Sequence, residues 1–250
     1  MVHLLPLPGA ARPAPMESVL AAARRDAARL AEAGFPGLVV ENYGDTPFLP
    51  GAVAPVTVAA MARVLLAVRE EVGDLPIGVN VLRNDAASAL GLAAACGMQS
   101  IRVNVHAGAR VTDQGLLEGR AWETLRLRSS WDADAVAIWA DVRVKHSAPL
   151  GAPRPIAEEV AEAVERGGAD AVIVTGPGTG VAVDGDELDE VCRATAAPVL
   201  VGSGVTADTV GAILARAHGA IVGTATKEGG RTTAPVDPAR ARAVVAASGL

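Results

Sequence analysis

The chain has few aromatic residues, little lysine and no long hydrophobic run. Phenylalanine, tryptophan and tyrosine make up 2% of its 250 residues, whereas hydrophobic residues of all kinds make up 50%. A core of alanine, valine and leucine suits helices packed on strands and excludes a disordered chain. No stretch approaches the roughly 20 apolar residues that cross a bilayer, and the N-terminus lacks the basic and apolar segments of a signal peptide. We therefore expect a soluble, cytoplasmic protein without a membrane partner.

An excess of positive charge is also missing. The formal net charge is −6 at pH 7, whereas nucleic acids and anionic membranes are bound by basic surfaces, so neither is expected as a partner. The only two cysteines, Cys96 and Cys192, lie in apolar stretches that we predict to be helical. They are interpreted as buried free thiols, which agrees with a reducing compartment.

Lysine is the scarcest cation. Only Lys145 and Lys227 are lysines among 22 basic residues. A chain with this bias would be expected to use arginine for an ordinary surface cation. An ammonium group is more compact than a guanidinium, and its pKa shifts more readily on burial. The two lysines are therefore candidates for positions where arginine would not serve.

Short runs of valine, isoleucine and leucine alternate with alanine-rich amphipathic stretches along the whole chain. The runs predict strands at residues 2–5, 38–41, 77–81, 101–105, 136–142, 171–175, 199–202 and 220–222. The stretches between them predict helices at residues 16–33, 56–72, 86–96, 121–130, 156–166, 187–196, 207–215 and 238–247. Eight such units predict an α/β protein with one domain over residues 1–250, a single (β/α)8 TIM barrel. A doubly wound open sheet is the alternative, but no G-x-G-x-x-G turn follows the first strand.

Rare polar residues gather where the predicted strands end. All four asparagines lie there, as do both lysines, and three of the four histidines lie in or just after a strand. Active sites of such barrels are built at this edge, so the pattern predicts an enzyme-like site. We predict Glu41, Asp141 and Lys145 as catalytic. The predicted substrate-binding residues are His3, Asn42, Asn80, Arg102, Asn104, His146 and Thr175.

Two of these predicted roles have open alternatives. Asp141 and Lys145 are on the same face of their strand, and they could form a plain buried ion pair instead of an acid–base pair. The side chains of His3, His106, His146, Glu41 and Asp141 could converge on a metal. However, no sequence motif places two of these ligands at a metal-binding spacing on one helix or strand, so we predict neither a metal nor another cofactor.

Glycine-rich turns follow the last three predicted strands. VGSGV (201–205) and VGTATK (222–227) would lie side by side and expose backbone N–H groups that can hold a phosphate. The predicted phosphate-binding residues are Gly202, Ser203, Gly204, Gly223, Thr224 and Lys227. The alternative is that these glycines only make tight turns. TGPGTG (175–180) is interpreted as a border of the substrate site or as a lid.

Several motifs together resemble the BtpA/SgcQ family over nearly the whole chain. They are MVHLLPLPG, ENYGDTPF, GVNVLRNDA, RVNVHAGA, DQG, ADVRVKHSAPL, TGPGTG, VGSGV and IVGTATKEGG. The resemblance implies a TIM barrel with a phosphate-type site. One branch of that family is known as a factor for photosystem I accumulation, and another is labelled as nucleosidase-like.

Three functions compete at this point. The first is cleavage of a glycosidic C–N bond in a phosphorylated nucleoside or related sugar phosphate, with Glu41 or Asp141 as acid or base. The second is a sugar-phosphate lyase, aldolase or isomerase that uses Lys145. The third is a non-catalytic assembly or regulatory protein, and metal-assisted hydrolysis is a remote fourth. The expected partner is a small phosphorylated molecule, and a homo-oligomer is left open.

Overall fold

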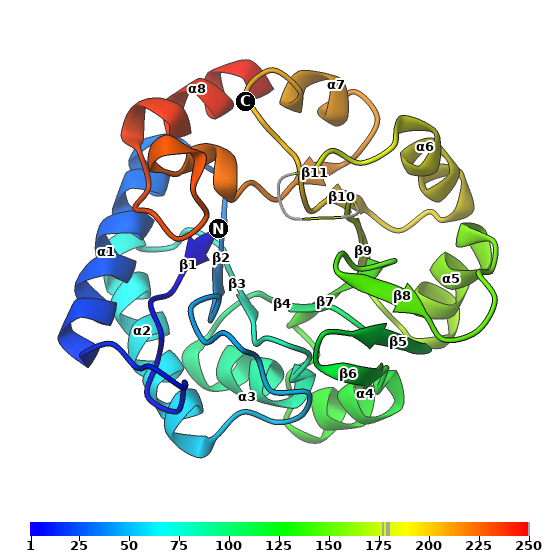
Figure 1. Ribbon diagram of the computed structural model, residues 1–250, viewed down its shortest axis with the longest axis horizontal. Helices are drawn as coiled ribbons and strands as arrows, with labels where there is room; N and C mark the ends of the chain where they lie inside the picture. The colour runs from blue at the N-terminus through cyan, green and yellow to red at the C-terminus, as the bar shows by residue number, and fades with distance from the viewer. Residues whose placement is uncertain (177, 179–180, 250) are drawn as a thin grey trace.

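Eight parallel strands curl into one sheet around a central axis, as the computed structural model shows (Figure 1). The structure describes residues 1–176, 178 and 181–249. Its strands, in spatial order, are β1 (Val2–His3), β2 (Leu38–Glu41), β3 (Ile77–Asn80), β4 (Ser100–Val103), β7 (Ala137–Val142), β9 (Ala171–Val174), β10 (Val199–Val201) and β11 (Gly219–Ala220). Each of them overlaps a predicted strand. The predicted TIM-barrel class is thereby confirmed.

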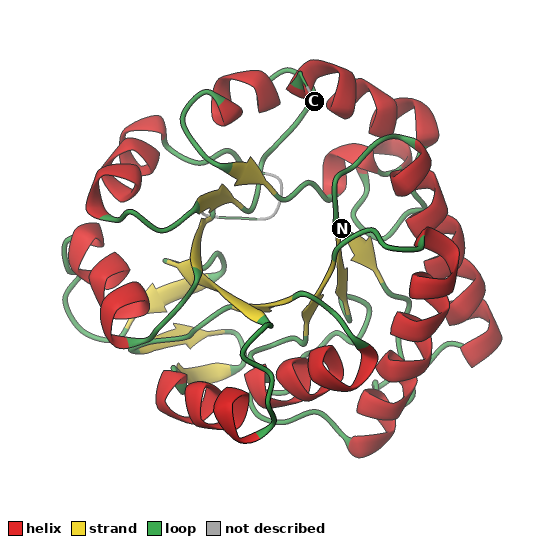
Figure 2. Cartoon of the chain, turned by 180° about the vertical axis from the view of Figure 1, so that it is seen from behind, coloured by secondary structure: helices red, strands yellow, loops and turns green. Residues whose placement is uncertain are grey.

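Helices surround the sheet on its outer side (Figure 2). They are α1 (Met16–Glu32), α2 (Pro55–Val72), α3 (Ala86–Cys96), α4 (Ala121–Ser130), α5 (Ile156–Ala161), α6 (Gly185–Ala194), α7 (Val210–Leu214) and α8 (Pro238–Ser248). A π-helical turn (Glu162–Arg166) extends α5, and two 3-10 turns, η2 (Thr224–Thr226) and η3 (Glu228–Gly230), precede α8. α7 is shorter than the prediction of residues 207–215, because Thr206 and Thr209 bond to each other's backbone and side chain in a turn before it.

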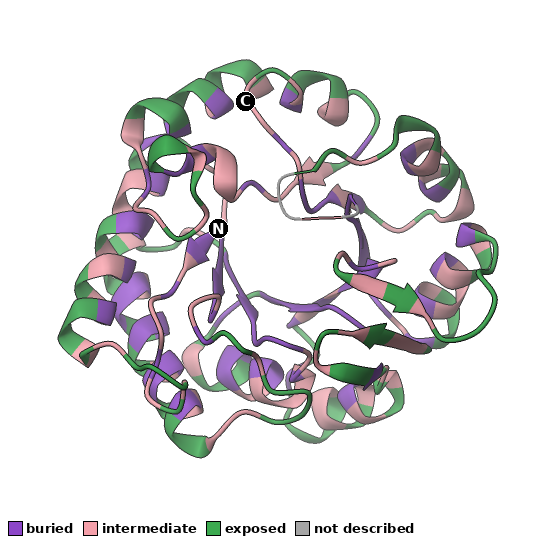
Figure 3. Ribbon diagram, in the orientation of Figure 1, coloured by how far each residue is buried: buried purple, intermediate pink, exposed green. Residues whose placement is uncertain are grey.

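The core lies between strands and helices, and it is aliphatic as predicted (Figure 3). Val40, Val79, Ile101 and Ile138 alternate with inward-facing residues and pack against α1, α2 and α3. A second cluster of mainly valines joins β9 and β10 to the later helices. Within the described part of the chain, none of the helices combines the length and apolarity that a membrane span requires.

The thiols differ from the prediction. Cys96 and Cys192 are both free, as expected, but they are partly exposed and not buried. Each lies near the end of its helix, where its side chain packs at the margin of an apolar cluster.

A second, three-stranded antiparallel sheet was not predicted. It consists of β5 (Ala109–Thr112), β6 (Gly115–Glu118) and β8 (Ser147–Pro149), in the order β6-β5-β8. β5 and β6 form a hairpin between β4 and α4, and β8 follows β7 (Figure 1). Leu117 anchors the hairpin against Val105 and Val144. The small sheet thus covers part of the barrel edge at which the parallel strands end.

Candidate functional site

Four polar residues form a row across adjacent strands inside the barrel. In the strand register, His3 is opposite Glu41, Glu41 is opposite Asn80, and Asn80 is opposite Arg102. Partners in a parallel register point to the same face of the sheet, so all four side chains face the barrel interior. Asn80 donates a hydrogen bond of 2.5 Å to Oε2 of Glu41 and fixes the carboxylate. The sequence prediction brought these four residues to one rim, and the structure places them side by side.

Asp141 lies one layer further along, in a closed network. Arg102 donates two hydrogen bonds to its carboxylate, of 2.9 and 2.8 Å, and Asn104 donates a third, of 2.9 Å. Burial alone would lower the pKa of Arg102, but the charge and hydrogen bonds of Asp141 raise it above its usual value. Asp141 therefore pairs with Arg102 and not with Lys145, and its side chain is fully buried. A role as a free acid or base does not fit this geometry, and positioning of Arg102 and Asn104 does.

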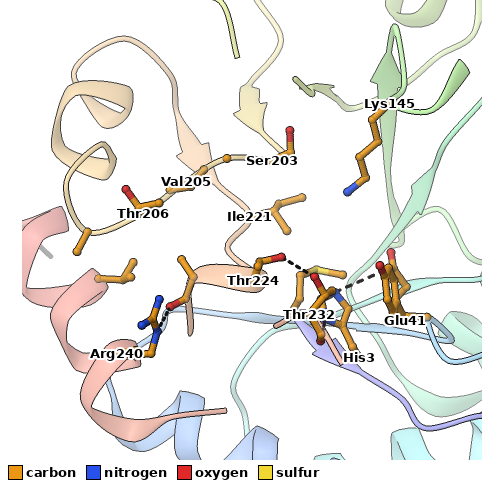
Figure 4. Close-up of a pocket in the computed structure, with 18 of the residues that line it drawn as sticks. His3, Glu41, Lys145, Ser203, Val205, Thr206, Ile221, Thr224, Thr232 and Arg240 are labelled. Atoms are coloured by element: carbon orange, nitrogen blue, oxygen red, sulfur yellow. Dashed lines mark hydrogen bonds and ion pairs between the residues drawn. The ribbon is translucent and has the colours of Figure 1, made fainter. Parts of the chain in front are cut away.

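Lys145, just beyond β7, directs its ammonium group into a cavity (Figure 4). Among the described residues, no hydrogen bond or ion pair to its Nζ is found. Burial is the largest cause that lowers the pKa of Lys145, and the positive charge of Arg102 lowers it further. The backbone N–H of Lys145 donates to the hydroxyl of Thr175, 3.0 Å away, which holds the turn in place.

His3 presents an unprotonated nitrogen to the same cavity. Its Nδ1 lies 3.2 Å from the carbonyl oxygen of Thr232, and a carbonyl only accepts, so Nδ1 carries the proton. Burial and then the charge of Lys227 lower the pKa of His3 well below its usual value, which keeps the ring neutral. Nε2 is therefore an acceptor, and it lies 3.7 Å from Oε1 of Glu41. Two acceptors this close suit a ligand hydroxyl that donates to one of them.

The two glycine-rich turns line a cavity of about 460 Å³, which we call the turn chamber. Among the described residues, the backbone N–H groups of Ser203, Gly204 and Gly223 have no hydrogen-bond acceptor. Arg240 also lines the chamber, held by a 2.9 Å hydrogen bond from its Nε to the carbonyl of Ala225. Figure 4 shows Arg240 and Lys145 approaching the cavity from opposite sides. These donors and cations suit an anionic group.

Two predicted phosphate ligands need correction. Lys227 is fully buried and pairs with Asp26 at 3.0 Å, so its ammonium points into the barrel wall and does not line the turn chamber. The hydroxyl of Ser203 donates to the carbonyl of Val181 and accepts from the N–H of Gly176, so only the backbone of Ser203 faces the chamber as a free donor. Thr224 does line the chamber, where its hydroxyl bonds to that of Thr232 at 2.9 Å.

A second cavity of about 360 Å³, the loop chamber, lies under the loops that follow β2, β3 and β7. Glu41, Tyr43, Arg102 and Lys145 line both chambers, so the two meet at these residues. The remaining lining residues of the loop chamber are Thr46, Phe48, Leu82, Arg83, Asn104, Asp113 and His146.

Besides Asp141 and Lys227, three more predicted site residues line neither chamber. Asn42 bonds to Asp45 and to both backbone groups of Leu82, which ties the loop after β2 to the loop after β3. Asn80 acts through Glu41, and Thr175 through the backbone of Lys145. Within TGPGTG, Pro177, Thr179 and Gly180 lie outside the described residues, so the predicted border or lid is not assessed there.

The predicted metal alternative is not supported by the positions of its ligands. His106 turns away and bonds the carbonyl of Gly167 at 2.8 Å, while Asp141 is occupied by Arg102. In the part of the chain that the structure describes, no group of three or more histidine, cysteine, aspartate or glutamate side chains could hold an ion.

The residues missed by sequence reasoning are Tyr43, Arg83, Thr232 and Arg240. Arg83 and Tyr43 were within recognised polar segments, and the rarity of tyrosine was an available signal. Thr232 and Arg240 are far from any predicted strand end. They reach the site only because the segment after β11 folds back over the barrel through η2 and η3.

Eight parallel strands with helices between them and a two-part polar cavity at their carboxyl ends define a TIM-barrel protein. The chain belongs to the BtpA family, whose family model matches residues 1–249. It is 42% identical to the photosystem I biogenesis protein BtpA of Synechocystis over 99% of this chain and 86% of that protein. It is 45% identical to an uncharacterised protein of Thermococcus kodakarensis, covering 98% of this chain and 92% of that protein.

Solved structures of low sequence identity share the fold. A thiamine phosphate pyrophosphorylase from Pyrococcus furiosus superposes with a TM-score of 0.61 at 14% identity, covering 90% of this chain and 89% of that one. A phosphoribosyl anthranilate isomerase from Thermus thermophilus superposes with a TM-score of 0.56 at 15% identity, covering 90% and 92%. At these identities the similarity establishes the fold alone.

Proposed function

We propose that this protein is an enzyme that cleaves the glycosidic C–N bond of a phosphorylated nucleoside or a closely related sugar phosphate. One observation carries the proposal: the turn chamber and the loop chamber meet at Glu41 and Lys145. A substrate with a phosphate at one end and a leaving group at the other would span both chambers. The bond between its two parts would then lie at the carboxylate and the ammonium.

The phosphate would lie in the turn chamber. The free N–H groups of Ser203, Gly204 and Gly223 and the guanidinium of Arg240 would surround it. The two similar proteins are named for a thiamine phosphate and a phosphoribosyl anthranilate. They support the idea that proteins of this fold can act on phosphorylated small molecules.

The chemistry requires one group that accepts a proton and one that donates it. Glu41 would take a proton from a water molecule as the water oxygen attacks the anomeric carbon. Lys145 would protonate the leaving nitrogen as the C–N bond breaks. The lowered pKa of Lys145 makes it a stronger acid than an ordinary lysine. This assignment replaces the predicted use of Glu41 and Asp141 as acid and base, since the carboxylate of Asp141 already accepts hydrogen bonds from Arg102 and Asn104.

The test is product release from a panel of nucleoside 5′-monophosphates, followed by chromatography and NMR. Wild-type protein is expected to release free base and ribose 5-phosphate from at least one of them. Glu41→Gln is expected to lower kcat by about 10²–10⁴-fold, the usual contribution of a general base. Glu70→Gln serves as the control, because Glu70 on α2 forms an exposed ion pair with Arg24 of α1. Release from no nucleotide, or full activity of Glu41→Gln, would contradict the proposal.

Carbonyl chemistry at Lys145 is the second candidate. It is favoured because this residue lines the cavity and its ammonium has no hydrogen bond or ion pair with any residue that the structure describes. The uncharged amine would attack an aldehyde or ketone carbon, and loss of water would form an imine. Borohydride added with ribose 5-phosphate would reduce that imine and leave a mass increase on the peptide that contains Lys145. No adduct in the wild type, or an equal adduct in Lys145→Arg, would exclude this candidate.

A further inference from the structure

We infer that the loop chamber binds a flat, neutral ring that carries a carbonyl oxygen next to a ring N–H, as in uracil or hypoxanthine. This inference rests on the proposed function and specifies its leaving group. Three features of the chamber carry it: an aromatic wall, a buried acceptor without a partner, and a buried guanidinium with free donors.

The aromatic wall is unusual for this chain. The chain contains one tyrosine and two phenylalanines. The tyrosine, Tyr43, and one of the phenylalanines, Phe48, line the loop chamber. Their ring centroids lie 6.5 Å apart in an edge arrangement. The rings of Tyr43 and His3 are tilted by 37°, with their centroids 4.8 Å apart. Both aromatic rings are partly exposed and follow β2 in a loop. Aromatic faces of this kind suit a planar ligand that stacks on them.

The acceptor is Oδ1 of Asn104. The amide of this residue is oriented without ambiguity, because Oδ2 of Asp141 only accepts and must face the Nδ2 donor. Oδ1 is buried, and no donor reaches it in the described part of the chain. A buried carbonyl without a partner is costly, and a ligand N–H would satisfy it.

The donors belong to Arg83, which is 5% exposed. One of its N–H groups donates to the carbonyl of Lys145 at 2.9 Å, and among the described residues no carboxylate lies within ion-pair distance of it. The other N–H groups remain available for a ligand carbonyl.

Charge decides between a neutral ring and a second anion. Glu41 and Asp113 line the chamber together with Arg83 and Lys145, and the charge of Arg102 is balanced by its ion pair with Asp141. The lining therefore carries no net charge, whereas a carboxylate subsite would need an excess of cations. A neutral ring that accepts from Arg83 and donates to Asn104 matches both sides of the chamber.

The experiment compares ligands by isothermal titration. Uridine 5′-monophosphate, cytidine 5′-monophosphate and ribose 5-phosphate are titrated into the wild-type protein at one pH and ionic strength. The uridine nucleotide should bind at least about tenfold more tightly than the other two, since cytosine offers an acceptor where uracil offers an N–H. Equal affinity for uridine and cytidine nucleotides, or for uridine nucleotide and ribose 5-phosphate, would overturn the inference.

Matched variants show which residues contribute to the affinity for the ring and which to the affinity for the phosphate. Phe48→Leu and Arg83→Met should weaken the uridine nucleotide about tenfold or more and leave ribose 5-phosphate unchanged. Phe35→Leu, at the other phenylalanine and at the opposite end of the barrel, should change neither. Arg240→Met should weaken both ligands, because it removes a phosphate contact. Circular dichroism checks that each variant is folded.

The same titrations separate this inference from the proposed function. If ribose 5-phosphate binds and Arg240→Met weakens it, but uracil adds no affinity, the ring subsite is wrong and the phosphate site stands. If ribose 5-phosphate does not bind at all, the proposed function fails, and uridine then tests the ring subsite alone. Binding of uridine that Phe48→Leu removes supports the subsite, and no binding of uridine overturns it.

Discussion

At the scale of single residues, the two lysines lie in different surroundings. Both follow strands, and a strand end shows that a residue is near the rim without showing where its side chain points. Lys145 points into the cavity, and Lys227 points into the wall, toward Asp26 on α1. The direction depends on the turn conformation after each strand, which has no simple sequence signature.

For Lys145 we predict a pH effect. A general acid must be protonated, so kcat should fall as the pH rises through the pKa of Lys145. Burial lowers that pKa below the usual 10.5, so the alkaline fall should come at lower pH than for an ordinary lysine. Lys145→Arg should remove the alkaline fall from the accessible range and lower kcat at least about 100-fold. A pH–rate profile checks both, and an unchanged profile in Lys145→Arg would contradict the role.

For Lys227 we predict a stability effect. Lys227→Met leaves the buried carboxylate of Asp26 without its ammonium partner, which should cost about 3–5 kcal/mol of the free energy of unfolding. The double variant Lys227→Met/Asp26→Asn should lose clearly less than the sum of the two single variants. Urea titrations followed by circular dichroism measure the three values. Additive losses would mean that the pair does not act as a unit.

At the scale of elements, the barrel strands could be predicted because most of them are short, largely aliphatic runs buried on both faces. The β5–β6 hairpin could not, because exposed Val111 and Leu116 make its outer face partly apolar and obscure the alternation. Periodicity distinguishes inner from outer positions poorly where both faces carry apolar residues. The small sheet matters for function, because Asp113 at the hairpin turn lines the loop chamber.

The hairpin offers a matched pair of leucines. Leu117 is 1% exposed and packs on Val105 and Val144, whereas the neighbouring Leu116 is 48% exposed. Leu117→Ala should cost about 2–4 kcal/mol of local stability through the cavity it leaves, and Leu116→Ala should cost almost nothing. Hydrogen exchange should show faster exchange at residues 109–118 in Leu117→Ala only. Equal protection in both variants would show that the hairpin does not depend on this contact.

At the scale of the whole molecule, the strand order ends on β1 and β11, and specific contacts connect these two ends. The amino group of Met1 donates to the carbonyl of Val222 at 2.8 Å, and Lys227 ties the segment after β11 to α1. These contacts join the first and last segments of the chain, which therefore stabilise each other.

We expect this arrangement to unfold as one unit, which also tests the prediction of a single domain over residues 1–250. Differential scanning calorimetry should show one transition with equal calorimetric and van't Hoff enthalpies. Two resolved transitions would contradict both the single domain and the coupling of the chain ends.

The network of Arg102, Asp141 and Asn104 has a consequence for how this sequence can vary. Each member satisfies a charge or a hydrogen bond of another. Replacing Arg102 alone would therefore leave a buried carboxylate without its ion-pair partner, and replacing Asp141 alone would leave a buried guanidinium without one. Intermediates with one change are therefore disfavoured, and the three positions should change together in descent or not at all. The network therefore couples β4 and β7 in the evolution of the sequence as well as in the structure.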